Sequence, residues 1–274
     1  MNETPQPTPE FASDNTTDTN HGSQLSSEPR AVLAGRGLKW LTEAWALIMK
    51  EPAVFIAMSV ISLVAIFVIN LVPLLGSLAV SLLWPAMMAG FFLAFKHAKQ
   101  RQSVTANDLF EPFKAPASLI AVGGMYVLAG IVLMLVLGII AFISIGSITE
   151  LVDGQINIAR MGAGLITLVL VSIPAALALA MAFMFAPVLV HEHQVPVIEA
   201  IKRSFSGSLR NILPFVVFFF IWFVFFIIIG SISIIPLIGW LIGMLAMIIY
   251  LPLFCGALFC AYNDIFLAHS DTEL

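Results

Sequence analysis

Charged residues are scarce in this 274-residue sequence: Asp, Glu, Lys and Arg make up 10% of it, whereas hydrophobic residues make up 60%. An average soluble domain is about one quarter charged, so this composition excludes an ordinary water-soluble domain. The few charges lie in a polar N-terminal tail and in short clusters between long apolar runs. Such a distribution is typical of the loops and spans of a membrane protein.

Cysteine is also scarce. The two copies, Cys255 and Cys260, lie five positions apart in one apolar stretch. On a helix this spacing separates their side chains by roughly 140°, which disfavours a disulfide and offers no metal-binding framework. We interpret them as small buried apolar residues.

Motifs of catalysis and cofactor binding are missing as well. The chain contains no GxSxG, Walker loop, HExxH or dinucleotide-binding motif, and no Asp, Glu, Lys, Arg or His falls within the core of a predicted span. The one cluster that resembles a metal site is His191-Glu192-His193, but two histidines two positions apart on a helix point in different directions. We therefore predict no catalytic residue, no cofactor and no metal, and interpret this cluster as part of an interfacial loop.

The terminal tails are polar. They carry many of the acidic residues behind the net charge of −4, which predicts solvated tails and no nucleic-acid partner. Residues 1–32 have few large apolar side chains and are predicted to be disordered. Residues 33–266 are predicted to form the membrane domain, followed by a short C-terminal tail over 267–274.

Long apolar runs divide into six predicted transmembrane helices. The run from 52 to 95 would measure roughly 66 Å as one helix, about twice the hydrocarbon thickness of a bilayer, so it must turn back near Asn70 and Pro73. A similar turn is predicted between Gly230 and Pro236. The fold class is all-α, a polytopic membrane helical bundle with spans at 52–71, 74–95, 117–147, 162–190, 212–235 and 237–262.

An internal repeat organises these spans. Pro73-Leu-Leu-Gly76 in the first turn matches Pro236-Leu-Ile-Gly239 in the last. Segments with amphipathic periodicity precede each pair of spans, at 37–52, 105–116 and 197–214, and are expected to lie in the membrane interface. The sequence therefore predicts three units, each a cytoplasmic interfacial amphipathic helix followed by a transmembrane hairpin, with the middle unit matching least well.

Basic residues set the predicted orientation. Apart from Arg160, every Lys and Arg lies before span 1, between spans 2 and 3, or between spans 4 and 5. By the positive-inside rule these segments and both termini are cytoplasmic. The predicted location is a bacterial inner membrane.

Three stretches carry a resemblance to a known family: Gly35-Arg-Gly-Leu-Lys-Trp40, Phe183-Met-Phe-Ala-Pro187 and Ala200-Ile-Lys-Arg-Ser204-Phe205. They look like stretches of a proteobacterial family of multi-pass inner-membrane proteins without assigned chemistry. The last also resembles, more distantly, the membrane domain attached to some glycerophosphodiester phosphodiesterases. The resemblance covers about residues 33–266 and implies fold and location; no phosphodiesterase catalytic domain is present.

Two sets of residues are candidates for binding or packing. The basic residues Lys39, Lys202, Arg203 and Arg210 are predicted to contact anionic lipid headgroups, although they could also serve only to set topology. Gly239 and Gly243 form a GxxxG step, which predicts close packing of helices, within the chain rather than between copies.

The leading functional hypothesis is a non-enzymatic inner-membrane protein that organises the bilayer or binds anionic lipids or other membrane proteins. The alternative is a permease for an uncharged or amphipathic solute, because Pro85, Pro174 and Pro252 could break spans along a pathway. The sequence leaves the oligomeric state open.

Overall fold

The computed structural model describes residues 24–145, 158–235 and 237–268. The predictions for residues 1–23, for the connection around Glu150 and Asp153, and for 269–274 lie outside these ranges. The described chain is helical, with one isolated β-bridge between Leu25 and Leu267. Its helices are α1 (Arg36–Ile48), α2 (Pro52–Ile69), α3 (Leu75–Lys99), η1 (Ala106–Leu109), η2 (Glu111–Lys114), α4 (Ala117–Ile145), α6 (Ile158–Phe183), α7 (Ala186–His193), α8 (Val197–Arg210), α9 (Ile212–Ile232) and α10 (Ile238–Phe266).

Six stretches of helix are long and apolar enough to cross a membrane, and they coincide with the six predicted spans. The shortest has 18 residues, or about 27 Å of helix, which approaches the hydrocarbon thickness of a bilayer. The stretches are Pro52–Ile69, Leu75–Lys99, Ala117–Ile143, Gly162–His193, Ile212–Ile232 and Ile238–Phe266. The all-α class and the number of apolar spans are thus confirmed.

The two copies of the sequence repeat form the same turn. Leu74 has φ 63° and ψ −56°, and Leu237 has φ 64° and ψ −55°, a conformation that non-glycine residues rarely adopt. In each turn the glycine N–H donates to the carbonyl four residues earlier, at 2.8 Å. A Cβ on Gly76 would lie 2.2 Å from the Ile69 carbonyl oxygen, so the close return of the chain requires a residue without one.

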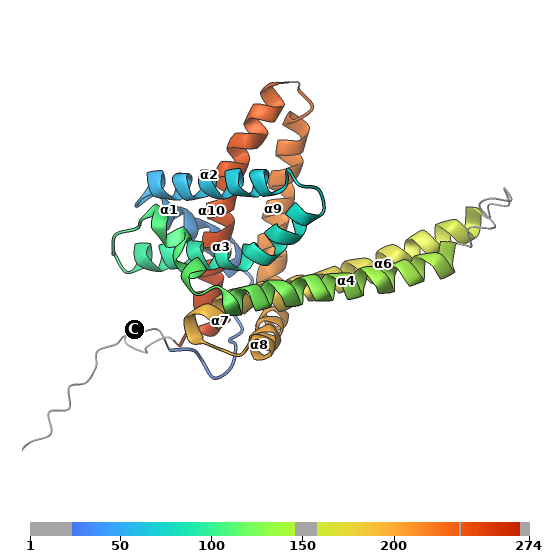
Figure 1. The fold of residues 1–274 in the computed structure, drawn as a ribbon, viewed down its shortest axis with the longest axis horizontal. Coiled ribbons are helices and arrows are strands. Elements are labelled where there is room, and N and C mark those ends of the chain that lie inside the picture. Colours follow the sequence, from blue (N-terminus) through green and yellow to red (C-terminus); the bar gives the residue numbers. More distant parts are fainter. Residues whose placement is uncertain (1–23, 146–157, 236, 269–274) are drawn as a thin grey trace, which may run out of the picture.

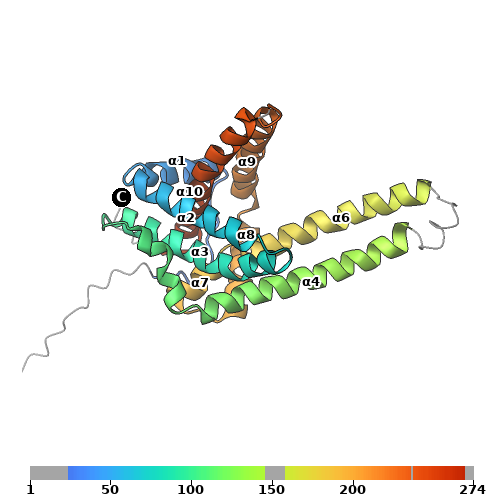
Figure 2. The ribbon, with the colours of Figure 1, turned by 45° about the horizontal axis from the view of Figure 1, so that its top comes forward.

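The helix pairs splay from a shared region rather than forming one parallel bundle. Helices α4 and α6 lie side by side and extend far from the rest, whereas α9 and α10 rise in another direction (Figures 1 and 2). We call the region where they meet the base; it comprises α1, α7, α8 and the ends of α3 and α10 at Lys96 and Tyr262.

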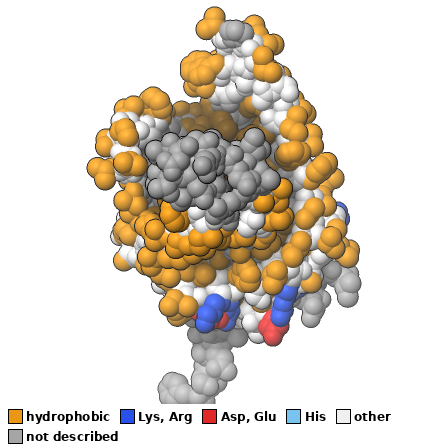
Figure 3. All heavy atoms as spheres, turned by 90° about the vertical axis from the view of Figure 1, so that its right-hand side faces the viewer, with side chains coloured by type: hydrophobic (Ala, Val, Ile, Leu, Met, Phe, Trp, Pro, Cys, Tyr) orange, Lys and Arg blue, Asp and Glu red, His pale blue; other side chains and the backbone are white. Residues whose placement is uncertain are grey.

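Large buried side chains concentrate in and around the base, among them Trp40, Phe95, Phe185 and Phe218. Away from it the apolar helices are exposed; no residue in the most hydrophobic windows of the third and fourth spans is buried. Figure 3 shows the resulting surface, with hydrophobic side chains over most of the face and charged ones at its margins. Lipid can cover such surfaces, so no apolar partner helix is needed there.

The predicted fourth span is interrupted. The sequence predicts one helix over 162–190, but α6 ends at Phe183 and α7 begins at Ala186. Pro187 lacks the N–H that would continue the helix. The buried Ser204 hydroxyl of α8 accepts from the Phe185 N–H at 3.0 Å and donates to the Met181 carbonyl at 2.7 Å, so it replaces a helical hydrogen bond at the break.

The middle amphipathic segment also differs from its prediction. Instead of one interfacial helix over 105–116, the chain forms the short 3₁₀ helices η1 and η2. A capping box begins this segment, with the Asp108 carboxylate accepting from the Thr105 N–H at 3.2 Å. Pro112 and Pro116 restrict the backbone and keep the segment from becoming a longer α-helix.

Part of the N-terminal tail is ordered, which corrects the prediction of disorder over 1–32 for its last nine residues. The Ser26 N–H donates to the Phe266 carbonyl, and the Arg30 N–H to the Ile265 carbonyl, both at 2.8 Å. Residues 24–33, which we call the N-terminal strap, therefore lie along the end of α10. The composition of residues 1–32 as a whole favoured disorder, although the strap itself carries Leu25 and Val32, which pack against the core; its backbone partners come from the far end of the sequence.

Candidate functional site

Charged side chains tie α1 to the end of α10 within the base. The Arg36 guanidinium donates to Asp264 Oδ2 from Nε at 2.6 Å and to Glu43 Oε1 from Nη1 at 2.9 Å. The Trp40 indole N–H also donates to Asp264, at 2.7 Å. Burial acts to lower the pKa of Arg36, but the hydrogen bonds and negative charges of Asp264 and Glu43 outweigh it and raise this pKa above its ordinary value.

Asn211 holds the strap against the start of α9. Its fully buried side chain accepts from the Val32 N–H and donates to the carbonyls of Arg30 and Gly207, each at 2.8 Å. It therefore satisfies backbone groups of two segments far apart in sequence. Asparagine is common as a local cap at the start of a helix, but this long-range role has no local sequence signal.

Helix α8 presents three different faces, separated by about 120° at 100° per residue. Small residues, including Ala200 and Gly207, are buried against neighbouring helices; a Cβ on Gly207 would lie 2.5 Å from the Phe266 ring. Bulky apolar residues occupy the second face and are exposed: Ile198 by 62% and Leu209 by 50%. Charged residues, among them Lys202, occupy the third. Ile198 and Leu209 are thus largely outside the packing of the described chain, whereas Ile201 at the edge of this face packs against the core.

The four predicted headgroup contacts lie in α1 and α8 but have different surroundings. Lys39 and Lys202 are exposed, and no described carboxylate pairs with either. Arg203 donates to Glu199 one turn earlier, at 3.1 Å. Arg210 donates from Nη1 to Glu28 Oε2 and to the Pro29 carbonyl, both at 2.9 Å, so it holds the strap.

The two glycines of the predicted GxxxG step lie in the first turns of α10. A Cβ on Gly239 would lie 2.6 Å from the Ile232 carbonyl oxygen, whereas one on Gly243 would lie 3.8 Å from Ser233 Oγ, an ordinary contact. The close approach at this step is therefore between Gly239 and the end of α9.

The His191-Glu192-His193 cluster joins α7 to two other helices. The Glu192 carboxylate forms an ion pair with Lys96 of α3, and the His193 ring is hydrogen-bonded to the Tyr262 hydroxyl of α10. Among the described residues no three His, Cys, Asp or Glu side chains gather as metal ligands. The cluster serves packing between helices at the base.

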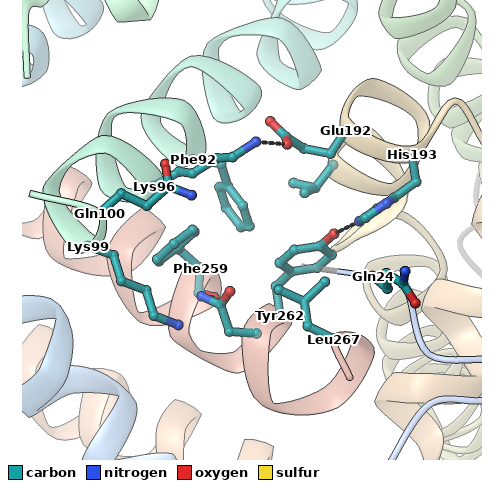
Figure 4. Close-up of a pocket in the computed structure, with 12 residues that line it drawn as sticks. Gln24, Phe92, Lys96, Lys99, Gln100, Glu192, His193, Phe259, Tyr262 and Leu267 are labelled. Carbon is teal, nitrogen blue, oxygen red and sulfur yellow. Dashed lines mark hydrogen bonds and ion pairs between the residues drawn. The ribbon is translucent and has the colours of Figure 1, made fainter. Parts of the chain in front are cut away.

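These contacts form one wall of a cavity of about 540 Å³ between α3, α7 and α10 (Figure 4). The apolar part of its lining includes Phe92, Val188 and Phe259, all of which are buried. Polar side chains from the three helices and from the strap surround this apolar part: Gln24, Lys96, Lys99, Gln100, Glu192, His193, Tyr262 and Asn263.

Sequence reasoning did not identify this cavity. Lys96 and Lys99 are visible in the sequence only as topology-setting cations, and Gln24 lies in a segment predicted to be disordered. Phe92, Phe259 and Tyr262 resemble ordinary span residues. The available signals were the one-turn spacing of Lys96 and Lys99 near the end of α3 and the His191-Glu192-His193 cluster, and neither specifies which helices face one another.

Comparison with known proteins gives one informative match. The chain is 26% identical over 203 residues to a protein of Burkholderia thailandensis named "Probable inner membrane protein", covering 70% of this chain and 74% of the relative. No family model matches the sequence, and no solved structure matches it. The similarity to glycerophosphodiester phosphodiesterases is not shown by these comparisons. With its six apolar spans, the chain is a multi-pass protein of the inner membrane.

Proposed function

We propose that the chain is a non-enzymatic protein that organises the inner membrane by holding its base in the cytoplasmic interface. Helix α8 lies flat there, with its bulky apolar face among acyl chains and its cations near anionic headgroups. Helix α1 contributes a second interfacial surface, since Leu38 and Trp45 are exposed on it by 53% and 45%. Tryptophan is favoured at the boundary between acyl chains and headgroups.

The orientation of α8 is the observation that supports this proposal most directly. An amphipathic helix on a soluble protein normally turns its bulky apolar residues inward. Here Ala200, Ser204 and Gly207 are buried instead, while Ile198 and Leu209 face outward beside Lys202. A helix with an exposed apolar face and adjacent cations has the properties of an interfacial membrane helix.

Clustering of cations also favours the cytoplasmic leaflet. Each lysine or arginine near an anionic surface contributes about 1 kcal/mol of attraction, which falls off within a Debye length. Lys39 and Lys202 have no described carboxylate partner, so their charge is available to headgroups.

Depth-dependent quenching tests the proposal. Single fluorophores would be attached to Leu209→Cys on the apolar face and to Glu199→Cys on the charged face of the full chain in vesicles. Cys255 and Cys260 are both buried and can be replaced by alanine in the background. We expect brominated lipid to quench the label at 209 and aqueous iodide to quench the label at 199. Iodide quenching at 209 equal to that at 199 would refute an interfacial α8.

Lipid enrichment tests the role of the cations. The variant Lys202→Gln with Arg203→Gln should carry less phosphatidylglycerol through purification than the wild type, because two attractive charges are removed. The matched control is Lys114→Gln with Arg101→Gln, which removes the same charge outside α1 and α8. Equal lipid content in all three proteins would contradict the proposal.

A further inference from the structure

We propose that the cavity between α3, α7 and α10 binds one amphiphile with a single negative charge, its anionic group at Lys99 and its apolar part against Phe92 and Phe259. The ligand chemistry is a phosphodiester or a carboxylate joined to a hydrocarbon group. This inference goes beyond the proposed function, because it concerns a partly open cavity between α3, α7 and α10, away from the outer faces of α1 and α8.

The size and composition of the cavity fit such a ligand. Its volume of about 540 Å³ lies within the usual range for small-molecule sites of about 300–1,000 Å³. Such sites combine an apolar lining with a few polar groups that orient the ligand. Phe92 and Phe259 meet edge to face, with ring centroids 5.8 Å apart, and form a rigid apolar surface.

The charge balance of the lining selects an anion. Lys96 and Glu192 pair with one another, and the His193–Tyr262 hydrogen bond satisfies a second pair of polar groups (Figure 4). Lys99 is exposed and has no carboxylate partner within 4 Å among the described residues. One positive charge is therefore left uncompensated in the lining, which favours a ligand with one negative charge.

Carboxylates beside Lys99 are already engaged. Glu43 and Asp264 line an adjacent hollow together with Lys99. Both accept hydrogen bonds from Arg36, and Asp264 also accepts from the Trp40 indole. The two carboxylates outnumber the single Arg36 charge by one, and Lys50, which lines the same hollow, offsets the difference. Neither carboxylate forms an ion pair with Lys99, so an added anion still gains a direct partner.

The strap contributes to the mouth of the cavity. Gln24 lies across the cavity from Lys99 (Figure 4). Its backbone carbonyl accepts from the Ala268 N–H at 3.0 Å, which fixes the residue while leaving its side-chain amide free to donate to an anion. Replacing this amide by a carboxylate would add a negative charge to the lining opposite Lys99, which opposes an anionic ligand, with little change in shape.

Ligand binding would be measured by native mass spectrometry of the full chain in nonionic detergent, with phosphatidylglycerol and oleate as separate probes. We expect one tightly bound molecule of at least one probe. Lys99→Gln and Gln24→Glu should each weaken it at least about tenfold, because a charged hydrogen bond is lost or opposed. Preference for phosphatidylglycerol identifies a lipid headgroup as the ligand, and preference for oleate identifies a free carboxylate.

Two controls separate this site from general lipid attraction. Lys114→Gln removes the same charge outside the cavity, and Lys202→Gln with Arg203→Gln alters only α8; both should retain binding within about twofold. If the quenching experiment refuted an interfacial α8, the binding expected at the cavity would be unchanged, so the two proposals are tested independently. The inference is wrong if neither probe binds the wild type, if Lys99→Gln and Gln24→Glu bind normally, or if a control loses binding equally.

Discussion

At the scale of single residues, the polar side chains at the base complete backbone hydrogen bonds that helices leave open. Ser204 hydrogen-bonds the backbone at the break between α6 and α7, and Asn211 hydrogen-bonds the backbone of the strap. Neither role follows from local sequence, because each partner lies 19 or more positions away. Long-range polar contacts of this kind are what the sequence could not predict.

Replacing Ser204 by alanine should destabilise the protein by about 1–3 kcal/mol, because the Phe185 N–H would lose its buried partner and the Met181 carbonyl would keep only the 3.4 Å contact from Ser208. Ser208→Ala is the matched control, since Ser208 makes only a 3.4 Å contact to Met181. Its effect should be below about 1 kcal/mol. Thermal unfolding in detergent measures both; equal losses would contradict the assigned role of Ser204.

Asp264→Asn should loosen α1 from α10, because Asp264 accepts from both Arg36 and Trp40. We expect a loss of about 1–3 kcal/mol in unfolding free energy, and Glu111→Gln, in an exposed pair, serves as the neutral control.

The pKa of Arg36 is raised in the folded state. The stability that this residue contributes is therefore fully present at pH values below its pKa in the unfolded chain, and is lost only as pH rises through its pKa in the folded protein. Stability due to Arg36 should therefore stay constant across the neutral range.

At the scale of elements, the sequence predicted the apolar helices well and their interruptions partly. Helix length and the turns near Pro73 and Pro236 follow from bilayer thickness and backbone chemistry. The break at Phe185 was missed because both sides of it are equally apolar, and hydropathy does not distinguish a bent span from a straight one. The cavity was missed because three helix ends from distant parts of the chain create it.

The repeated turn makes a prediction of its own. Gly76→Ala and Gly239→Ala should each cost about 2 kcal/mol or more, because the new methyl group would overlap a carbonyl oxygen 2.2 or 2.6 Å away. Gly243→Ala should change stability by less than about 0.5 kcal/mol, since its nearest contact would be 3.8 Å away. Unfolding of the three variants in the same detergent compares them directly. A penalty at Gly243 equal to that at Gly239 would mean that the GxxxG step acts as a unit.

At the scale of the whole molecule, α4 with α6 and α9 with α10 diverge from a base that holds most of the described ion pairs. Hydrogen bonds, ion pairs and aromatic packing stabilise the base, whereas lipid can surround the parts of α4, α6, α9 and α10 that extend away from it. That the basic segments share the cytoplasmic side stays a prediction of the sequence; the sequence did not predict that α1, α7 and α8 would meet the ends of α3 and α10 in one base. The permease alternative stays a prediction of the sequence.

Topology can be tested with reporters and labels. A reporter active only in the periplasm should be silent when fused after Leu274 and active when inserted near Glu150, because the positive-inside rule places these positions on opposite sides. Lys99 and Arg203, replaced by cysteine, should react with an impermeant reagent only in inverted vesicles. Labelling of either position from outside intact cells would reverse the orientation.

The bridge between Leu25 and Leu267 brings the two ends of the described chain together through backbone hydrogen bonds, without a covalent link. Two nitroxides at the exposed Ser27 and Ala268 should therefore broaden each other's resonance, although 241 positions of chain separate them. Any ligand or substitution that separated the two ends would reduce this dipolar broadening and sharpen the spectrum. The line width would then report whether the strap is bound to the end of α10.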